Sequence, residues 1–393
     1  MRIIMHIDVN NAFLSWTAVY LLNNGYKKDI RTIPSVIGGD ETARHGIVLA
    51  KSPVAKNYGI KTAETLYQAR LKCKNLEVYP ANYEFYEEQS NKLINLIKNY
   101  TPDIEQFSID ECFIDYTKVA KLYGDEIKFA YKLKDEIYEK LGFTVNIGIG
   151  NSKLCAKMAS DFQKPNMVHT LYDNEIQTKM YPLDVNELLY IGKSSTAKLK
   201  ELKINTIGDL ANADYNKLYK YFKNQTTNMI NSAKGIDDSP VLTEDTKEKS
   251  ISKSFTLKTN ICTQMEAFNS LKILSDYIAY NLRGKKLYAS VITVILKDKY
   301  FKTYSHQTSL SNSTNSFNVI FNTSKQLFNE MWDLEPIRLI GLSVSKLNDK
   351  LANQISLFEN TDKIIKDDNI DKVVDKLKEK YGNKIINKAS FFK

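Results

Sequence analysis

The sequence predicts a mixed α/β chain with more than one domain. Four segments have the apolar, β-branched composition of short strands and are separated by segments of helical periodicity: residues 3–9, 104–109, 112–116 and 143–150. Apolar and polar residues alternate again in four later segments: residues 252–257, 288–296, 301–310 and 338–347. Because 393 residues exceed what one hydrophobic core usually organises, we expect these two groups of strands to belong to separate domains.

Three carboxylates lie near the end of the first predicted strand and at the tip of the hairpin that the next two strands would form. Asp8 lies near the C-terminal end of the first strand, and only Asp110 and Glu111 separate the second strand from the third. This spacing predicts a tight hairpin with two carboxylates at its tip. In a split βαβ sheet the central strands would bring Asp8 to this tip, although about 100 residues intervene.

The remaining elements follow from periodicity and from helix end signals. Helices are expected at four places: residues 84–100, 130–141, 265–282 and 367–381. Gly142 is expected to end the second of these, and Asn151 to cap a further helix that stops before Lys164. Residues 188–210 have the pattern of paired helix-hairpin-helix units, and residues 239–248 have the composition of a linker.

Charge and cysteine usage narrow the class of protein. Lys and Arg outnumber Asp and Glu by 55 to 46, a net charge of +9, which favours nucleic acid or an anionic membrane surface but also fits an ordinary basic protein. The four cysteines form no CxxC pair, so neither a zinc site nor a disulfide framework is indicated. No segment approaches the roughly 20 apolar residues of a membrane helix. We therefore expect a cytoplasmic protein without membrane contact.

Three carboxylates on strand ends suit magnesium chemistry. Mg²⁺ prefers carboxylate and water oxygens, and two ions about 4 Å apart can stabilise both the attacking and the leaving oxygen of a phosphoryl transfer. The ligands would be Asp8, Asp110 and Glu111, and the backbone carbonyl of Val9 could add a fourth. An isolated Asp-Glu pair is usually only a polar turn, so the surrounding sequence must decide.

That surrounding sequence resembles the Y family of translesion DNA polymerases. The similarity lies in HIDVNNAF at 6–13, QFSIDECFIDYT at 106–117 and NIGIGNSKLCAKMASDFQKPN at 146–166. The resemblance implies that Asp8, Asp110 and Glu111 are catalytic and hold two Mg²⁺ ions, with Glu111 serving the ion nearer the primer oxygen. It also implies that Lys164 contacts the triphosphate of the incoming dNTP.

Two further segments match the substrate-binding part of the family. Phe13 stands where the family keeps an aromatic steric gate against the ribose 2′-hydroxyl, although the neighbouring Ala12 replaces a common aromatic. Residues 47–63 resemble the fingers segment that covers the nucleotide, where Lys56 would bind phosphate and Lys51 could assist. Without the resemblance, Phe13 would be an ordinary core aromatic and each lysine a solvated surface charge.

DNA-binding and clamp-binding residues are also implied. Gly192 and Gly208 of the helix-hairpin-helix region would offer backbone N–H groups to DNA phosphates. A basic cluster on the later strands would grip the DNA backbone: Arg283, Lys285, Lys286, Lys297, Lys299 and Lys302. Finally, residues 354–358 look like the peptide that docks on the bacterial sliding clamp (beta subunit), with Gln354, Leu357 and Phe358 as anchors.

The resemblance predicts a right-hand polymerase with a split βαβ palm, small fingers, a helix-hairpin-helix thumb and an α/β little finger. The expected ranges are palm 1–10 and 78–165, fingers 11–77, thumb 166–240, linker 241–248, little finger 249–350, and clamp peptide with tail 351–393. Such a monomer would add dNTPs to primer-template DNA with low fidelity and no proofreading, in tolerance of DNA damage. The alternatives are a nucleotidyl cyclase with a similar sheet and a catalytically silent DNA-bound scaffold.

Overall fold

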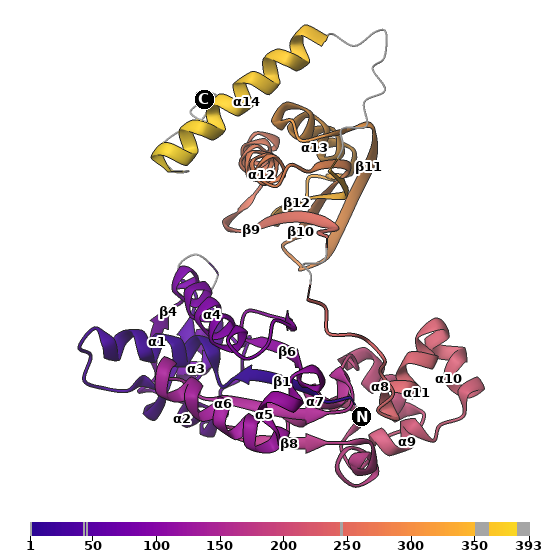
Figure 1. Ribbon diagram of the computed structural model, residues 1–393. Coiled ribbons are helices and arrows are strands. Elements are labelled where there is room, and N and C mark those ends of the chain that lie inside the picture. Colours follow the sequence, from indigo (N-terminus) through magenta and orange to yellow (C-terminus); the bar gives the residue numbers. More distant parts are fainter. Residues whose placement is uncertain (1, 42–43, 45, 244–246, 350–360, 383–393) are drawn as a thin grey trace. The chain divides into compact units, whose positions relative to one another are not determined.

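A computed structural model (Figure 1) describes residues 2–41, 44, 46–243, 247–349 and 361–382, and the side chains of residues 361–368 are not part of that description. The chain divides into two compact units. Unit 1 consists of Met1–Asp40 and Gly46–Thr246, and unit 2 of Glu41–His45 and Lys247–Lys393. The mixed α/β class predicted from the sequence is confirmed. The finer division into palm, fingers and thumb stays a prediction.

The main sheet of unit 1 has five strands in the order β5-β6-β1-β7-β8. Their bounds are β1 Ile4–Val9, β5 Ile104–Gln106, β6 Glu111–Asp115, β7 Val145–Gly150 and β8 Val168–Leu171. β1 pairs antiparallel with both β6 and β7, so it is the central strand. The strands predicted from composition therefore exist, and the first one lies beside the acidic hairpin as expected.

Side chains alternate between the two faces of this sheet. Met5, Ile7 and Val9 pack into the largest core with residues of α4 (Tyr83–Lys98) and α6 (Glu126–Leu141). The opposite face is covered by α7 (Lys153–Ser160), which packs on β1, β7 and β8. Asp8 belongs to this second face, because it alternates with the core residues of β1.

Two local predictions in this region were wrong. β5 ends at Gln106 and β6 begins at Glu111, so the hairpin connection is Phe107–Asp110 rather than Asp110-Glu111 alone. The loop is longer because the N–H groups of Phe107 and Ser108 both donate to the Glu111 carbonyl. The cap of α7 is Ser152, which accepts from the N–H of Cys155, whereas the side chain of Asn151 bonds to other backbone groups.

A smaller subdomain follows β1 along the chain. It contains α1 (Ala12–Asn23), α2 (Pro53–Asn57), α3 (Leu66–Lys72) and a three-stranded sheet, β3 (Val48–Lys51), β2 (Ser35–Gly38) and β4 (Glu77–Pro80). None of these elements was predicted individually from the sequence. Each strand has only four residues, too few for a periodic pattern to develop.

The last part of unit 1 is helical. It contains α8 (Lys193–Glu201), α9 (Ile207–Ala211), α10 (Tyr215–Phe222) and α11 (Thr226–Ala233), which share a core with α7. Short helices complete unit 1: α5 Ala120–Tyr123, η1 Ile30–Thr32, η2 Tyr116–Lys118, η3 Asp173–Glu175, η4 Ile176–Met180, η5 Val185–Glu187 and η6 Lys223–Gln225.

Unit 2 is a four-stranded antiparallel sheet with helices on one face. The strand order is β11-β10-β12-β9, with bounds β9 Ser250–Ile261, β10 Tyr288–Asp298, β11 Thr303–Thr314 and β12 Ile337–Asn348. Two helices, α12 (Gln264–Gly284) and α13 (Phe317–Met331), form the core with the sheet. The sequence prediction missed α13. A last helix, α14 (Thr361–Tyr381), begins six residues before the predicted start at residue 367.

The helix α14 is attached to α12 by ion pairs. Arg283 of α12 lies 2.6 Å from Asp375 and 3.2 Å from Asp371, and Lys378 lies 2.5 Å from Asp276.

Among the described residues, no helix combines the length and the apolar character that a membrane crossing requires.

Candidate active site

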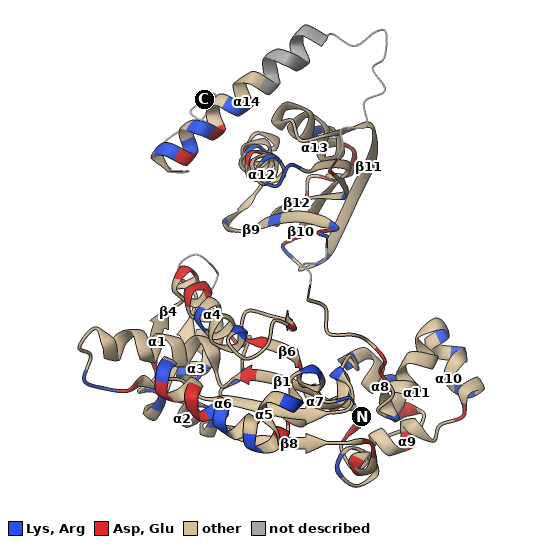
Figure 2. Ribbon diagram, viewed as in Figure 1, with Lys and Arg blue, Asp and Glu red and all other residues tan. Residues whose placement is uncertain are grey.

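The three predicted residues lie close together along the chain ends of two neighbouring strands, β1 and β6. Asp8 of β1 stands directly opposite Glu111 of β6 in the antiparallel register. Asp110 is adjacent, because its carbonyl accepts a hydrogen bond of 3.0 Å from the N–H of Val9. Acidic residues colour the neighbouring ends of β1 and β6, and basic residues colour α7 (Figure 2). The structure therefore brings all three predicted residues together where β1 ends and β6 begins.

Two lysines neutralise these carboxylates. The Nζ atom of Lys164 lies 2.5 Å from Oδ2 of Asp8 and 2.8 Å from Oδ1 of Asp161. The Nζ atom of Lys157 lies 2.8 Å from Oε1 of Glu111. The carboxylate of Asp110 instead accepts a hydrogen bond of 2.7 Å from the hydroxyl of Ser108.

Burial and charge shift the two facing carboxylates in opposite directions. Burial raises the pKa of Asp8 to about 6, and the nearby ammonium of Lys164 only partly offsets this. Burial would also raise the pKa of Glu111, but the imidazole of His6 and the ammonium of Lys157 outweigh it and lower that pKa to about 2. Glu111 is thus ionised at any physiological pH, whereas Asp8 holds its charge less firmly.

The donor set fits a divalent cation that prefers oxygen ligands. Among the described residues, no three His, Cys, Asp or Glu side chains form a ready-made metal cluster. Asp8 and Glu111 each have a cationic partner, Lys164 and Lys157 respectively. Carboxylates that need positive charge beside them are the hard oxygen donors that Mg²⁺ accepts.

Sequence reasoning missed the residues that hold the loop of Lys164. Asn146 of β7 is fully buried and donates to the carbonyls of Ser160 and Gln163, at 3.1 and 2.9 Å. Asn10 donates to Asn146 at 3.1 Å and accepts from the N–H of Asn166 at 2.9 Å. Buried amides at the ends of β1 and β7 were the available signal, since such groups must find hydrogen-bond partners.

Phe13 is the second residue of α1 and is held by aromatic contacts. Its ring stacks on Tyr86 at 4.7 Å with an interplanar angle of 9°, and its edge meets Tyr83 at 5.9 Å. The Tyr86 hydroxyl is in turn hydrogen-bonded to Thr17 at 2.8 Å. The ring is therefore fixed in place a few residues beyond Asp8, although its role toward a sugar stays a prediction.

Lys51 and Lys56 lie close enough to influence each other. Lys51 ends β3, and Lys56 lies in the short helix α2. Burial lowers the pKa of Lys51, and the positive charge of Lys56 lowers it further. Two like charges that disfavour each other gain when an anion lies between them, which is the arrangement predicted for a triphosphate.

Comparison with known proteins now gives the family. The sequence matches the impB/mucB/samB family over residues 7–161 and the C-terminal domain of the same family over residues 248–357. The chain belongs to this family. The two matched segments contain Asp8, Asp110 and Glu111 in the first and the sheet of unit 2 in the second.

Similar proteins agree with this assignment. DNA polymerase IV of Clostridium acetobutylicum is 45% identical over 390 residues, which cover 99% of this chain and 98% of the relative. DNA polymerase IV 1 of Bacillus subtilis is 32% identical over 397 residues, which cover 100% of this chain and 94% of the relative. Among solved structures, a Y-family DNA polymerase chimera of Dbh and Dpo4 matches 88% of this chain and 100% of its own, with a TM-score of 0.77 and 26% identity.

An insertion ternary complex of Dbh DNA polymerase matches with a TM-score of 0.61 at 25% identity and covers 87% of this chain and 98% of that one. This family member is a Y-family translesion DNA polymerase, as the sequence predicted. Dependence on a divalent metal follows from that identity. The cyclase and silent-scaffold alternatives are not favoured.

The two glycines predicted to contact DNA differ in this polymerase. Gly192 is the N-cap of α8, and a Cβ built there would meet no atom within 4 Å. The N–H of Gly208 instead donates to the carbonyl of Tyr181 at 3.0 Å. A Cβ on Gly208 would lie 3.1 Å from that of Tyr181. The predicted mechanism therefore fails for Gly208, whose N–H is already engaged and whose small size serves packing.

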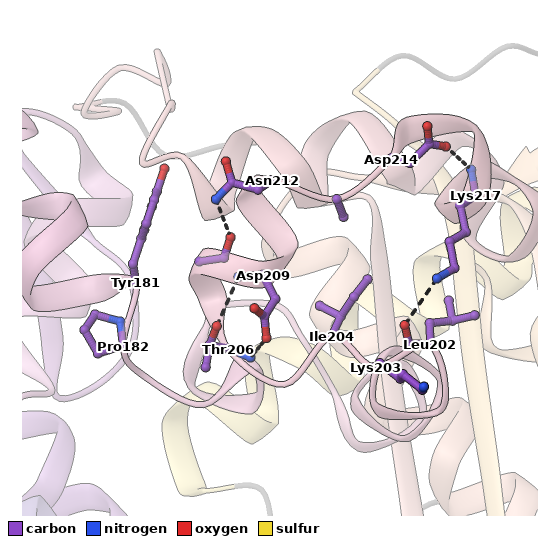
Figure 3. Close-up of a pocket in the computed structure, with 12 residues that line it drawn as sticks. Tyr181, Pro182, Leu202, Lys203, Ile204, Thr206, Asp209, Asn212, Asp214 and Lys217 are labelled. Atoms are coloured by element: carbon purple, nitrogen blue, oxygen red, sulfur yellow. Dashed lines mark hydrogen bonds between the residues drawn. The ribbon is translucent and has the colours of Figure 1, made fainter.

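Gly208 lies beside a surface hollow of about 740 Å³, drawn in Figure 3. Its polar groups largely bond to one another: Asp209 accepts from the N–H of Thr206 at 2.9 Å, and Asn212 donates to the carbonyl of Gly208 at 2.9 Å. Lys217 reaches the carbonyl of Leu202 at 3.4 Å. Because these groups are satisfied internally, we assign no ligand to the hollow.

The lysines predicted to form one grip surface are spread over unit 2. Lys285 and Lys286 follow α12, whereas Lys297 lies at the far end of β10 and Lys299 just beyond it. Residues 288–296 of the strand lie between Lys286 and Lys297, which corresponds to about 30 Å at the usual rise per residue. The prediction of a single patch is therefore wrong, although contacts of each lysine with DNA stay predictions.

Arg283 of the same predicted cluster is buried against Asp371 and Asp375 of α14 and is not available to DNA. Lys299 lies 3.2 Å from Glu335, and Lys285 pairs with Glu248. The residues predicted to bind the clamp, Gln354, Leu357 and Phe358, lie outside the described residues.

Proposed function

We propose that Asp8, Asp110 and Glu111 hold two Mg²⁺ ions at which the polymerase joins dNTPs to a primer 3′ end. The observation that supports this most is that Asp8 and Glu111 stand opposite each other in the antiparallel register of β1 and β6. The backbone hydrogen bond of 3.0 Å from the N–H of Val9 to the carbonyl of Asp110 supports Asp110 as a third ligand, and the carbonyl of Val9 would complete the ligand set. The bound ions would supply Lewis-acid stabilisation of the attacking and leaving oxygens.

The lysines around this site would bind the triphosphate. The side chain of Lys164 is 36% exposed, so it is free to leave Asp8 when positive charge arrives there. Its ammonium group would then contact a phosphate, as would Lys56 and Lys51 from the neighbouring subdomain. Together they would orient the dNTP and balance the charge of its phosphates. Phe13, fixed by Tyr86, would exclude a 2′-hydroxyl.

The DNA partner would be a primer-template duplex. A solved relative is titled as an insertion ternary complex of Dbh DNA polymerase, which supports DNA and dNTP as partners here. The first turn of α8 after Gly192 leaves backbone N–H groups without helical acceptors, and such groups suit a phosphate. Lys285, Lys286, Lys297 and Lys299 would add contacts that depend on salt concentration.

The face of the unit 2 sheet that points away from α12 and α13 offers a second kind of DNA contact. One register row across its four strands reads Ser252, Ser343, Thr293 and Gln307. These side chains are short, uncharged hydrogen-bonding groups, which suit a phosphate backbone without reading sequence. Sequence reasoning concentrated on lysines and missed this row.

The subdomain roles are part of the same proposal. Residues 1–10 and 78–165 would act as palm, 11–77 as fingers, 166–240 as thumb and 249–350 as little finger. The polymerase would act as a monomer tethered to the bacterial sliding clamp through Gln354, Leu357 and Phe358.

Counting bound metal tests the proposal. Mn²⁺, a spectroscopic substitute for Mg²⁺, is titrated by electron paramagnetic resonance into the complex of protein, dideoxy-terminated primer-template and dNTP. We expect two tightly bound ions for the wild type and fewer for Asp8→Asn. Equal counts for both proteins would contradict the assigned ligands.

A further inference from the structure

Lys157 is an unusual partner for a residue of the active site because it is almost inaccessible. Only 10% of its side chain is exposed, and its Nζ atom lies 2.8 Å from Oε1 of Glu111. A charge that is taken out of water in this way is stable only when its partner is close and well oriented. The pairing therefore fixes one oxygen of Glu111 and leaves Oε2 on the other side of the carboxylate.

The other side of Glu111 faces a second fixed group. His6 of β1 is fully buried, and its Nε2 atom lies 3.8 Å from Oε2 of Glu111. Its Nδ1 atom shares a hydrogen bond of 2.8 Å with the hydroxyl of Ser160, which donates to the carbonyl of Lys157 at 2.8 Å. The ring also packs on Phe113 at 4.6 Å. His6 thus lies beside Glu111 and is hydrogen-bonded, through Ser160, to the helix that carries Lys157.

The helix that supplies Lys157 cannot shift easily. α7 packs so close to β7 that a Cβ on Gly148 would lie 2.0 Å from the carbonyl oxygen of Ala156. A Cβ on Gly150 would lie 2.7 Å from that of Cys155. Glycines at these two positions allow the close approach, and the approach in turn delivers Lys157 to Glu111.

The two lysines of the site therefore differ in kind. The side chain of Lys164 is 36% exposed and follows α7 in a loop, whereas that of Lys157 is 10% exposed and belongs to the helix itself. Displacing Lys164 from Asp8 returns its charge to solvent or to a phosphate. Displacing Lys157 from Glu111 would leave a largely buried charge whose other carboxylate partner, Asp161, lies 3.8 Å away.

We propose that Lys157 is a positioning residue for nucleotide transfer: it stays bound to one oxygen of Glu111 throughout the reaction and presents the other oxygen to the metal. This inference rests on the proposed function of Glu111 as a metal ligand. Removing the ammonium group would let Glu111 adopt other rotamers, so the chemical step suffers while dNTP and DNA binding do not. Partners of metal ligands typically change activity or metal affinity by about 10- to 100-fold when removed.

The test compares Lys157→Met with a matched control on the same helix. Lys153 lies one turn earlier on α7, and its Nζ atom pairs with Glu105 at 2.6 Å with similar burial. Lys153→Met removes an equivalent ion pair away from the three carboxylates. Each variant is measured for kcat and for the KM of dNTP in single-nucleotide primer extension, for the Kd of primer-template DNA, and for its melting temperature.

We expect Lys157→Met to lower kcat by about 10- to 100-fold with KM and Kd within about twofold of wild type, and Lys153→Met to leave kcat unchanged. Raising the Mg²⁺ concentration should partly restore kcat in Lys157→Met. Equal kcat in Lys157→Met and wild type would overturn the inference, and so would parallel losses in kcat, KM and Kd. If Lys157→Met does not fold, Lys157→Gln replaces it, and wild-type kcat in that variant would overturn the inference equally.

A double variant separates this inference from the proposed function beneath it. In a Glu111→Gln background, Lys157→Met should change the residual rate by less than about twofold, because its effect acts through Glu111. A full additional loss in that background would contradict positioning through Glu111. Wild-type activity in Glu111→Gln alone would instead contradict the proposed function, whatever Lys157 does.

Discussion

Asp8 and Glu111 face each other across β1 and β6, and each is paired with a different lysine. The side chain of Lys164, the partner of Asp8, is 36% exposed, whereas that of Lys157, the partner of Glu111, is 10% exposed. We therefore expect the Asp8–Lys164 pair to separate when a metal binds and the Glu111–Lys157 pair to stay intact. Their pKa values differ accordingly, about 6 for Asp8 and about 2 for Glu111. Each of these two carboxylates is thus balanced by an ammonium group before a metal arrives, and a metal would compete mainly with Lys164.

The raised pKa of Asp8 predicts that Asp8→Asn makes the metal-free protein more resistant to urea above pH 6. Burial raises the pKa to about 6 from the ordinary 3.8, so between these values the folded chain binds protons more tightly than the unfolded chain. The wild type therefore loses stability as pH rises through this interval, and an asparagine does not. The interval corresponds to about 3 kcal/mol at about 1.4 kcal/mol per pH unit.

Urea midpoints of both proteins, measured in EDTA from pH 4.5 to 7.5, check this. The advantage of Asp8→Asn should grow from pH 4.5 to about 6 and then level off. A difference that stays constant over the whole range would show that the charge of Asp8 does not oppose folding.

Gly148→Ala should destabilise the protein and reduce its activity together. The added Cβ would lie 2.0 Å from the carbonyl oxygen of Ala156, so α7 must move away and take Lys157 with it. Overpacking of this severity costs about 3 kcal/mol or more. Gly284→Ala, where a Cβ meets nothing within 4 Å, is the control. Melting temperatures and extension rates decide, and a Gly148→Ala protein as stable and active as the control would refute the packing account.

Phe13→Ala should allow the polymerase to incorporate ribonucleotides. The ring is held on Tyr86 at 4.7 Å, and its removal opens the space that a 2′-hydroxyl needs. Discrimination between dNTP and rNTP, measured as the ratio of kcat/KM values, is expected to fall by about 100-fold or more. Tyr20→Ala, which removes an exposed aromatic from the same helix, should leave the ratio unchanged. Unchanged discrimination in Phe13→Ala would exclude it as the gate.

Loss of the clamp peptide should separate tethering from chemistry. Alanines at Gln354, Leu357 and Phe358 remove the glutamine and both apolar anchors that would enter a pocket on the clamp. Pull-down by the bacterial sliding clamp should be abolished, while primer extension without the clamp keeps its wild-type rate. Alanines at Asn353 and Ser356 serve as the control. Binding that survives the triple substitution would place the clamp contact elsewhere.

Sequence patterns predicted β1, β5, β6 and β7 of the main sheet because these strands are rich in apolar residues, but they did not predict β8, which has only four residues. They also predicted α6 up to Gly142, whose backbone has the left-handed φ of 78° that favours glycine. The short strands of the small subdomain, such as Ser35–Gly38, escaped prediction because four residues give no period. The helix α13 was missed although its buried residues recur at helical spacing, and no element was predicted between residues 311 and 337.

Residues of the site that belong to a sequence motif could be predicted, whereas contacts that depend on tertiary packing could not. Asp8, Asp110 and Glu111 stand in a recognisable pattern, so their meeting could be foreseen. The engagement of the Gly208 N–H by Tyr181 and the distance between Lys285 and Lys297 depend on the fold. The partnership of Lys157 with Glu111 depends on how closely α7 approaches β7, which only the glycines of β7 hint at.

The most direct test of the central claim is single-nucleotide primer extension in Mg²⁺ under single-turnover conditions. Wild type is compared with the double variant Asp110→Ala/Glu111→Ala, after circular dichroism has shown that both are folded. We expect the double variant to be slower by about 10³-fold or more, since the ions would contribute several kcal/mol to stabilising the transition state. A double variant that extends primers as fast as wild type would contradict the assignment of these carboxylates as the catalytic centre.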